Sequence, residues 1–367
     1  MKNFNDIQPI ETWFEGINKL PLIISGPCSA ENRIQVLETG KQLHATGKIR
    51  IYRAGIWKPR TRPGSFEGVG ALAFPWLKEL KKETGMLIAV EAATAEHVKL
   101  CTENSDAIDI LWIGARTVSN PFSMQALADA LVNSHFPVLV KNPINPELAL
   151  WMGAIERLLA CGITKIAAIH RGFYPFEKTR LRNIPKWEIP IELKIRIPNL
   201  SIINDPSHIS GTTEYIREIA QKALDLSFDG LIIESHYKPE EALSDKAQQL
   251  KPSEINELLN SLEYRCTETA DKKIQHTLEK YRHQIDSIDF QLLELLKARM
   301  DIVERIGEYK IKNNISIFQL RRWREILDGR IEYGNKLGLS ESLVRKLLQI
   351  VHEESVQVQT QIFNQKL

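Results

Sequence analysis

Short runs of β-branched and aliphatic residues recur between residues 20 and 236, and a segment with helical spacing follows each run. The runs are LIISGP, IRIYRAGI, LIAVEAA, ILWIGAR, FPVLVKN, KIAAIHR, LSIINDPS and GLIIESH. Strands that alternate with helices are typical of a parallel sheet. Eight repeats in about 215 residues predict a (β/α)8 TIM barrel. An open doubly wound sheet has the same local pattern and is the alternative.

The pattern changes after about residue 250. Residues 251–270 read as a polar linker with a short helical piece. From Ile274 to Tyr309 the apolar residues follow at alternating intervals of four and three, which predicts one long helix. Two further amphipathic helices are expected near 319–335 and 340–364. The sequence therefore predicts a barrel domain over 1–250, a linker over 251–270 and an all-α three-helix domain over 271–367.

The long helix also indicates a partner chain. At about 1.5 Å per residue it extends roughly 55 to 60 Å, which is more than one small domain can cover. A second copy packed along it would bury the remaining apolar positions. We therefore expect a homodimer that forms through the helical domain.

Composition narrows the classes of partner and compartment. The chain has 48 basic and 46 acidic side chains, so no overall field attracts nucleic acid or a membrane surface. Its four cysteines are far apart, and neither a zinc motif nor a disulfide framework is indicated. Acidic residues interrupt the N-terminal segment, and no apolar run reaches membrane-spanning length. These features predict a cytoplasmic protein with no nucleic-acid or membrane partner.

Polar residues stand at the ends of the eight runs, where a parallel barrel brings them to one face. Five cations at one rim indicate an anionic substrate that carries phosphate and carboxylate. Ordinary solvated strand-end charges are the alternative. These residues are Cys28, Arg53 and Lys58, Glu91, Arg116, Lys141, Arg171, Asp205 with His208, and Glu234 with His236.

Four residues of this rim form a candidate metal set. Cys28, His208, Glu234 and, beyond the last run, Asp245 combine one sulfur, one nitrogen and two carboxylate ligands. This mixture suits a divalent ion such as manganese, iron, cobalt or zinc. The alternative is a buried apolar cysteine and a structurally satisfied histidine.

Several motifs of the barrel region occur in the order seen in the type I-beta branch of the 3-deoxy-D-arabino-heptulosonate 7-phosphate (DAHP) synthases. The resemblance covers about residues 20–250. The motifs are Gly26-Pro27-Cys28-Ser29, Lys58-Pro59-Arg60-Thr61, Ile113-Gly114-Ala115-Arg116, Asp205-Pro206-Ser207-His208 and Ala242-Leu243-Ser244-Asp245.

The resemblance implies condensation of phosphoenolpyruvate with erythrose 4-phosphate, with release of phosphate. It implies that Cys28, His208, Glu234 and Asp245 bind the metal ion, with manganese as the first expectation. Arg60 and Thr61 would engage erythrose 4-phosphate, and Lys58 is the first candidate for proton handling. Phosphoenolpyruvate would be held by Arg53, Lys58, Arg116, Lys141 and Arg171.

Two residues depart from the DAHP synthase pattern. Arg62 stands where Ser commonly follows the Lys-Pro-Arg-Thr motif, and His170 stands where Glu often precedes Arg-Gly. Both departures concern the expected erythrose 4-phosphate contacts. The competing enzyme is 3-deoxy-D-manno-octulosonate 8-phosphate synthase, whose relatives usually carry an Asn-containing motif at Lys58-Pro59-Arg60-Thr61.

The predicted long helix contains one cation in its apolar seam, Arg299, and Lys310 lies on the same face three turns later. A buried cation is costly unless an anion meets it, so the two cations indicate an anion-binding site. The alternative is a coiled-coil dimer in which both side chains extend to solvent.

Residues 281–299, Glu354-Ser355-Val356 and Gln359 resemble the all-helical chorismate mutases. The resemblance implies that chorismate is rearranged to prephenate, with Arg299, Lys310 and Gln359 as catalytic residues. Arg282 would come from the partner subunit. The chorismate pocket would be formed by Arg282, Arg299, Lys310, Arg322, Ser355 and Gln359.

Trp323 replaces the usual Glu, and Gln319 replaces a common Asp, so the mutase activity is expected to be weaker or differently tuned. A dimerising, ligand-sensing module with little activity is the alternative. Only about 20 residues precede the first expected strand, which is too few for an N-terminal regulatory domain. We therefore expect regulation to come from the helical domain, where bound prephenate or chorismate would inhibit the barrel.

Overall fold

The structure is a computed structural model that describes residues 3–17, 21–58, 64, 66–132, 134–175, 179–265 and 270–365. The chain divides into two compact units, Met1–Thr267 and Glu268–Leu367. Each unit is described by itself.

The first unit contains a closed barrel of parallel strands, which confirms the predicted (β/α)8 architecture. Each strand pairs with the next, and the eighth described strand pairs with the first in the order β1-β2-β3-β4-β5-β6-β7-β8. An open doubly wound sheet is therefore excluded. The strands are β1 Leu22–Gly26, β2 Ile51–Ala54, β3 Leu87–Ala92, β4 Ile110–Ile113, β5 Val138–Lys141, β6 Ile166–His170, β7 Ser201–Asn204 and β8 Gly230–Glu234.

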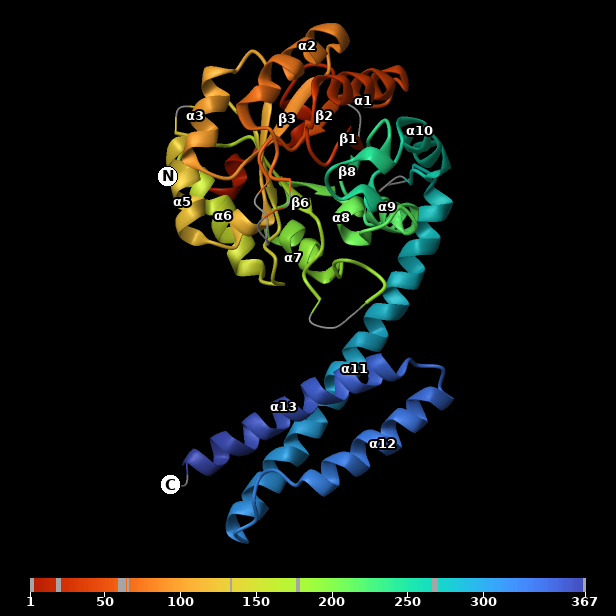
Figure 1. Ribbon diagram of the computed structural model, residues 1–367. Helices are drawn as coiled ribbons and strands as arrows, with labels where there is room; N and C mark the ends of the chain where they lie inside the picture. Colours follow the sequence, from red (N-terminus) through yellow and green to blue (C-terminus); the bar gives the residue numbers. More distant parts are fainter. Residues whose placement is uncertain are drawn as a thin grey trace. The chain divides into compact units, whose positions relative to one another are not determined.

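Helices surround the strands (Figure 1). Helix α10, which follows the last strand, buries Ile255 and Leu259 in the same core as the barrel helices. The helices of this unit are α1 Arg33–Ala45, α2 Phe74–Thr84, α3 Ala95–Glu103, α4 Ala115–Val118, α5 Pro121–Ala130, α6 Leu148–Ala160, α7 Glu188–Arg196, α8 Pro206–Ser210, α9 Ile216–Asp225 and α10 Pro252–Ser261.

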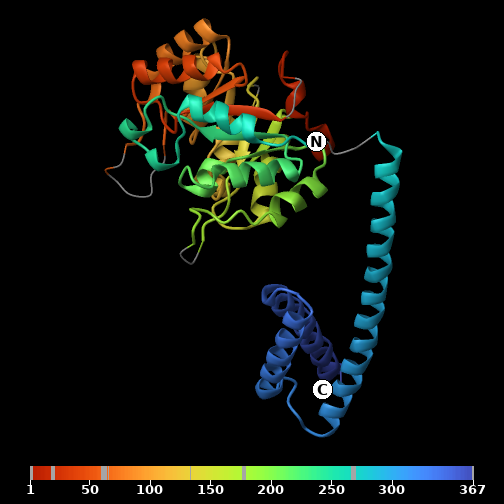
Figure 2. The same cartoon turned by 90° about the vertical axis from the view of Figure 1, so that its right-hand side faces the viewer.

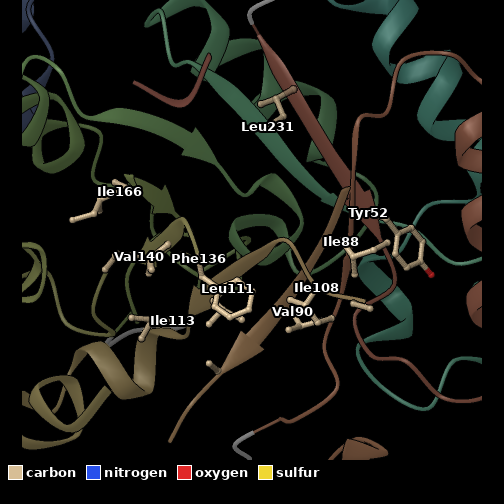
Figure 3. Packing of buried hydrophobic residues seen from close by; sticks show 14 of the residues in the cluster. Tyr52, Ile88, Val90, Ile108, Leu111, Ile113, Phe136, Val140, Ile166 and Leu231 are labelled. Carbon is tan, nitrogen blue, oxygen red and sulfur yellow. The ribbon is translucent and has the colours of Figure 1, made fainter. Parts of the chain in front are cut away.

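Successive strand residues point to opposite sides of the sheet, so the barrel has two separate apolar layers. Ile88 and Val90 of β3 belong to the outer layer, between strands and helices (Figure 3). Ala89, between them, belongs to the inner layer together with Trp112. Buried strands of this kind read as continuous apolar runs, which is the pattern seen in the sequence.

The N-terminal segment contributes to the inner layer. Ile10, Trp13 and Ile17 belong to the same buried cluster as the inward-facing residues of the strands. The Trp13 indole nitrogen donates a hydrogen bond to the Gln8 carbonyl at 2.8 Å. The inner layer is thus filled with apolar side chains, and polar chemistry is left to the carboxyl ends of the strands.

The second unit contains α11 Lys272–Lys312, α12 Leu320–Lys336 and α13 Glu341–Gln365. The predicted long helix and the two shorter helices are confirmed. Helix α13 packs against both α11 and α12. Figure 2 shows α13 beside the C-terminal part of α11, where Val303 and Gly307 are buried. Residues 272–295 of α11 are exposed throughout.

Candidate active sites

At the carboxyl ends of several strands, a polar side chain follows two positions after an inward-facing apolar residue and therefore lies on the same side of the sheet. On β2, Ile51 lies in the inner apolar layer, and Arg53 is two residues further on. On β8, Glu234 follows Ile232 in the same way. The same spacing holds for Lys141 on β5. The alternation of the strands therefore places apolar residues in the barrel and charged residues at its mouth.

These side chains line a pocket at the carboxyl ends of the strands, in which the described residues include six cations. The pocket contains every residue that the sequence assigned to phosphoenolpyruvate. Its lining consists of Arg53, Lys58, Glu91, Gly114, Ala115, Arg116, Lys141, Arg171, Arg182, His208 and Asp245.

Arg53 lies at the base of this pocket with a side chain only 1% exposed. Its Nη2 is 3.2 Å from Glu234 Oε1 and donates to the Cys28 carbonyl at 3.2 Å. Its guanidinium lies 4.8 Å from the centre of the Trp112 ring. Burial opposes its charge, but Glu234, with Asp205 and Glu91, outweighs burial and raises the pKa of Arg53. Its buried Nε and Nη1 have no hydrogen-bond partner within the described residues, so two donors remain for an anion.

Lys58 connects the pocket to Cys28. Its Nζ donates to the Cys28 carbonyl at 2.6 Å and to Sγ at 2.8 Å. Sγ in turn donates to Asp245 Oδ2 at 3.2 Å. Burial, followed by the charge of Glu234, raises the pKa of the Cys28 thiol to about 12. The thiol is therefore protonated at neutral pH even beside the Lys58 ammonium, and a further cation is needed to favour a thiolate.

The four predicted metal ligands form two pairs, Cys28 with Asp245 and His208 with Glu234. His208 Nε2 lies 3.8 Å from Glu234 Oε1. Across the described ranges, no group of three or more His, Cys, Asp or Glu side chains is close enough to form a ready-made metal site. The donor types nevertheless fit a divalent ion of intermediate softness, and the buried Oε1 of Glu234 accepts no hydrogen bond from a described residue. The residues present therefore fit a metal ion.

Asp205 connects the predicted metal ligand His208 to the pocket cation Lys141. Its Oδ2 lies 2.8 Å from His208 Nδ1 and 3.1 Å from Lys141 Nζ. Burial opposes its charge, but His208 and Lys141 hold the pKa of Asp205 well below its ordinary value. A ligating histidine is commonly oriented by such a carboxylate. Asp205 thus orients His208 and holds Lys141 at the pocket.

Arg171 and His170 lie on opposite sides of the barrel wall. Arg171 lines the pocket, and its Nη1 donates to Asn183 Oδ1 at 2.9 Å. Its neighbour His170 is buried on the outer side against Trp187 and Phe228. The departure at His170 is therefore accommodated by an aromatic cluster outside the pocket. The predicted contacts at Arg60 and Thr61, and the departure at Arg62, lie outside the described residues.

Arg182 lines the pocket and was missed by the sequence reasoning. Its Nη1 lies 3.0 Å from Asp245 Oδ1 and donates to Gln248 Oε1 at 2.8 Å. Gln248 Nε2 then donates to Glu234 Oε2 at 2.7 Å. Arg182 stands in the loop between β6 and α7, far from any strand end, so no local pattern marks it. Only the arrangement of the loops at the barrel mouth could identify it.

The second unit brings three of its predicted residues together. Arg299 Nη1 donates to Ser355 Oγ at 2.6 Å, and Gln359 Nε2 donates to the Ser355 carbonyl at 3.2 Å. The buried Oε1 of Gln359 has no hydrogen-bond partner within the described range. This α11–α13 contact therefore presents a guanidinium and an unsatisfied amide oxygen side by side.

Lys310 lies near the same region, and its Nζ donates to the Ile317 carbonyl at 2.5 Å. Neither Lys310 nor Arg299 forms a salt bridge with any described residue. Burial lowers the pKa of Lys310, and burial with nearby Arg330 lowers the pKa of Arg299. Clustered cations without carboxylate partners favour an anionic ligand.

Two predicted residues are not joined to this group. Arg322 lies 3.4 Å from Glu325 on its own helix, and Arg282 lies 3.2 Å from Glu279 on its own helix. Both side chains are largely exposed. The expectation that Arg282 serves a partner subunit stays a prediction.

The barrel and its cationic mouth define a class of enzyme that acts on anionic substrates, and comparison with known proteins identifies the family. The model of the DAHP synthetase I family matches residues 6–269, and that of chorismate mutase type II matches residues 281–360. The chain belongs to the DAHP synthetase I family and carries a chorismate mutase domain. Enzymes of this family are generally metal-dependent.

Relatives support both assignments. A phospho-2-dehydro-3-deoxyheptonate aldolase of Thermotoga maritima is 32% identical over 65% of this chain and 68% of the relative. A crystal structure of a DAHP synthase from that organism has a TM-score of 0.57 at 32% identity, covering 65% of this chain and 67% of the other. A bifunctional chorismate mutase/prephenate dehydratase of Buchnera aphidicola is 33% identical over 24% of this chain. The chain spans 23% of that relative's length.

No described helix is long and apolar enough to cross a membrane.

Proposed function

We propose that the barrel condenses phosphoenolpyruvate with erythrose 4-phosphate to DAHP and phosphate, and that the helical unit converts chorismate to prephenate. The observation that carries the first part is the cationic pocket with Arg53 at its base. Arg53 Nε and Nη1 are buried donors that lack a partner among the described residues. Unpaired buried donors are costly, and an anionic substrate would satisfy them.

Arg53, Lys58, Arg116, Lys141 and Arg171 would hold phosphoenolpyruvate by its phosphate and carboxylate. Guanidinium groups bind both anions through paired hydrogen bonds, and clustered cations also offset the repulsion between two phosphorylated substrates. Arg60 and Thr61 are proposed to contact erythrose 4-phosphate. Lys58 is proposed to handle a proton, because its ammonium already donates to Cys28 Sγ at 2.8 Å.

Cys28, His208, Glu234 and Asp245 would hold a divalent metal ion, for which we propose manganese; iron, cobalt and zinc also suit these ligands. The chemistry gained from a bound ion is Lewis-acid polarisation of the erythrose 4-phosphate aldehyde. The chain's own residues orient the ligands. Asp205 orients His208, Gln248 holds Glu234, and Arg182 holds Asp245.

In the helical unit, Arg299, Lys310, Arg322, Ser355 and Gln359, with Arg282 of the partner copy, would bind chorismate. The rearrangement is pericyclic and needs no acid or base, so the pocket has to hold the compact conformer and stabilise charge on the ether oxygen. Lys310 and Gln359 are the proposed ether-oxygen donors. Gln359 would donate through Nε2, which now binds the Ser355 carbonyl at 3.2 Å.

A second copy of the chain is the proposed partner. Residues 272–295 of α11 are exposed and carry large apolar side chains, including Leu278, Ile285, Ile288 and Leu292. Exposed apolar surface on this scale marks an interaction site. Homodimerisation along α11 would cover it and would bring Arg282 to a neighbouring pocket.

The test is to assay both reactions on the purified full-length protein. We expect phosphate release from phosphoenolpyruvate with erythrose 4-phosphate, loss of this activity with a chelator, and restoration by Mn²⁺. Preference for arabinose 5-phosphate would instead support the 3-deoxy-D-manno-octulosonate 8-phosphate synthase alternative. Prephenate formation should exceed the uncatalysed rate, and Arg299→Ala should abolish it while the dimer persists. Chorismate binding without turnover would support the sensing module.

A further inference from the structure

His352 of α13 lies in the helical unit beside the group formed by Arg299, Lys310 and Ser355. Its ring stacks on the face of Trp323 from α12, with ring centres 3.9 Å apart and planes 12° apart. Phe318 covers it from another direction at 5.9 Å. Two aromatic side chains, one on α12 and one just before it, therefore fix the orientation of the imidazole on α13.

The held imidazole has an unsatisfied nitrogen. His352 Nε2 is buried and has no hydrogen-bond partner within the part of the chain that the structure describes. A buried polar atom without a partner costs about 1–3 kcal/mol. A purely structural stack would be equally well served by an apolar ring, so the nitrogen indicates a ligand.

The surrounding charges indicate which kind of ligand. Burial, followed by Arg299 and Lys310, lowers the pKa of His352, so the imidazole is neutral at neutral pH. Chorismate carries two carboxylates, an ether oxygen and one ring hydroxyl. The cations match the carboxylates, whereas a neutral imidazole nitrogen matches a hydroxyl, which can both donate and accept.

We propose that His352 is a substrate-contacting residue of the mutase pocket, whose Nε2 hydrogen-bonds the ring hydroxyl of chorismate, and that Trp323 is the positioning residue that holds it. This inference rests on the proposed mutase activity. Trp323 then has a role that compensates for the missing Glu: it contributes no carboxylate but holds the His352 imidazole of α13 in place.

The test compares kcat and KM for prephenate formation in single and double variants. His352→Leu removes the hydrogen bond and should lower kcat/KM at least about tenfold. His352→Gln replaces the imidazole with an amide that can still hydrogen-bond the hydroxyl, and its kcat/KM should stay within about threefold of the wild type. Trp323→Leu should lower kcat/KM, and the double variant should be no worse than His352→Leu, because Trp323 acts through His352.

The substrate contact is tested with a chorismate analogue whose ring hydroxyl is replaced by hydrogen. His352→Leu and the wild type should process this analogue equally well. His44→Leu is the control, because His44 is exposed on α1 of the barrel unit and belongs neither to a proposed substrate site nor to the proposed dimer surface of α11. Retained helical circular dichroism and unchanged DAHP synthase activity establish that the variants are folded.

Two results would overturn the inference: wild-type kcat/KM in His352→Leu, or an equal loss with the analogue and with chorismate. A double variant that loses more kcat/KM than His352→Leu would assign Trp323 a separate role and overturn the positioning claim. A wild-type protein without turnover would overturn the mutase function and this inference with it. Wild-type turnover together with an unaffected His352→Leu would overturn the inference alone.

Discussion

Burial controls the ionisation of the residues at the barrel mouth, and it does so in different directions. Burial lowers the pKa of Lys141 and lowers that of Arg171 to about 10. For Glu234, burial acts against the charge, but His208 and Arg53 outweigh it and lower the pKa. The cations remain charged because buried carboxylates face them, and the pocket stays able to bind anions.

Arg53 is the residue whose replacement should affect both stability and activity. Arg53→Met leaves Glu234 buried without its cation, and breaking a buried pair costs about 3–5 kcal/mol. We expect this loss in the free energy of unfolding, measured by urea titration with tryptophan fluorescence, and a fall of at least about 100-fold in DAHP formation. Arg180→Met is the control, since its pair with Glu218 is exposed and worth less than about 1 kcal/mol. Equal stability losses in both variants would contradict the buried-pair argument.

His170 should make the barrel sensitive to acid. Its Nε2 lies 2.6 Å from the Pro185 carbonyl and its Nδ1 lies 3.1 Å from Asn204 Nδ2, a pairing that suits the neutral ring. Burial lowers its pKa from 6.5 to about 4. The unfolded chain therefore binds the proton more readily, and stability is present above about pH 6.5 and is lost as the pH falls toward 4.

His170→Gln should reduce this loss. The measurement is the free energy of unfolding between pH 7 and about pH 4. The exposed His276→Gln serves as control and should follow the wild type. If the free energy of unfolding of His170→Gln falls with decreasing pH as steeply as that of the wild type, the acid sensitivity belongs to other groups.

At the level of the element, α11 has two different halves. Its C-terminal part buries Val303 and Gly307 against other helices of its own unit, whereas residues 272–295 are exposed. Isolated helices gain most of their stability from packing of an apolar face. The exposed half should therefore depend on a second copy for its order.

Leu292→Asp should weaken the dimer. A carboxylate in the apolar seam must be desolvated on association, so we expect a dissociation constant at least about 100-fold higher. Sedimentation velocity over a concentration series measures the change. Ser287→Asp, on another face of the same helix, should leave the association unchanged. Identical behaviour of the two variants would mean that the dimer does not use this face.

At the level of the whole molecule, the chain divides into two compact units, and the barrel unit has its own buried core, so its activity should be separable. A chain that ends after Thr267 should retain DAHP synthase activity. If prephenate or chorismate bound to the helical unit inhibits the barrel, this truncation should abolish the inhibition, because coupling requires both sites. Initial rates with and without each ligand test this. A full-length enzyme that is indifferent to both ligands would disprove the regulation.

The sequence determined the elements and the polar mouth of the barrel. Strand and helix periods are local properties, and the two-residue alternation that places Ile51 inside the barrel also places Arg53 at its mouth. The same alternation places Ile169 inside the barrel and turns His170 outward.

Only the tertiary structure decided which separate side chains meet. Arg182 reaches Asp245 from a loop, and His352 meets Trp323 from another helix. These contacts join residues 63 and 29 positions apart in the sequence. Their geometry depends on how loops and helices pack, which no local period encodes. The sequence therefore determined the fold and the charges at the site, whereas packing determined which charges and rings act together.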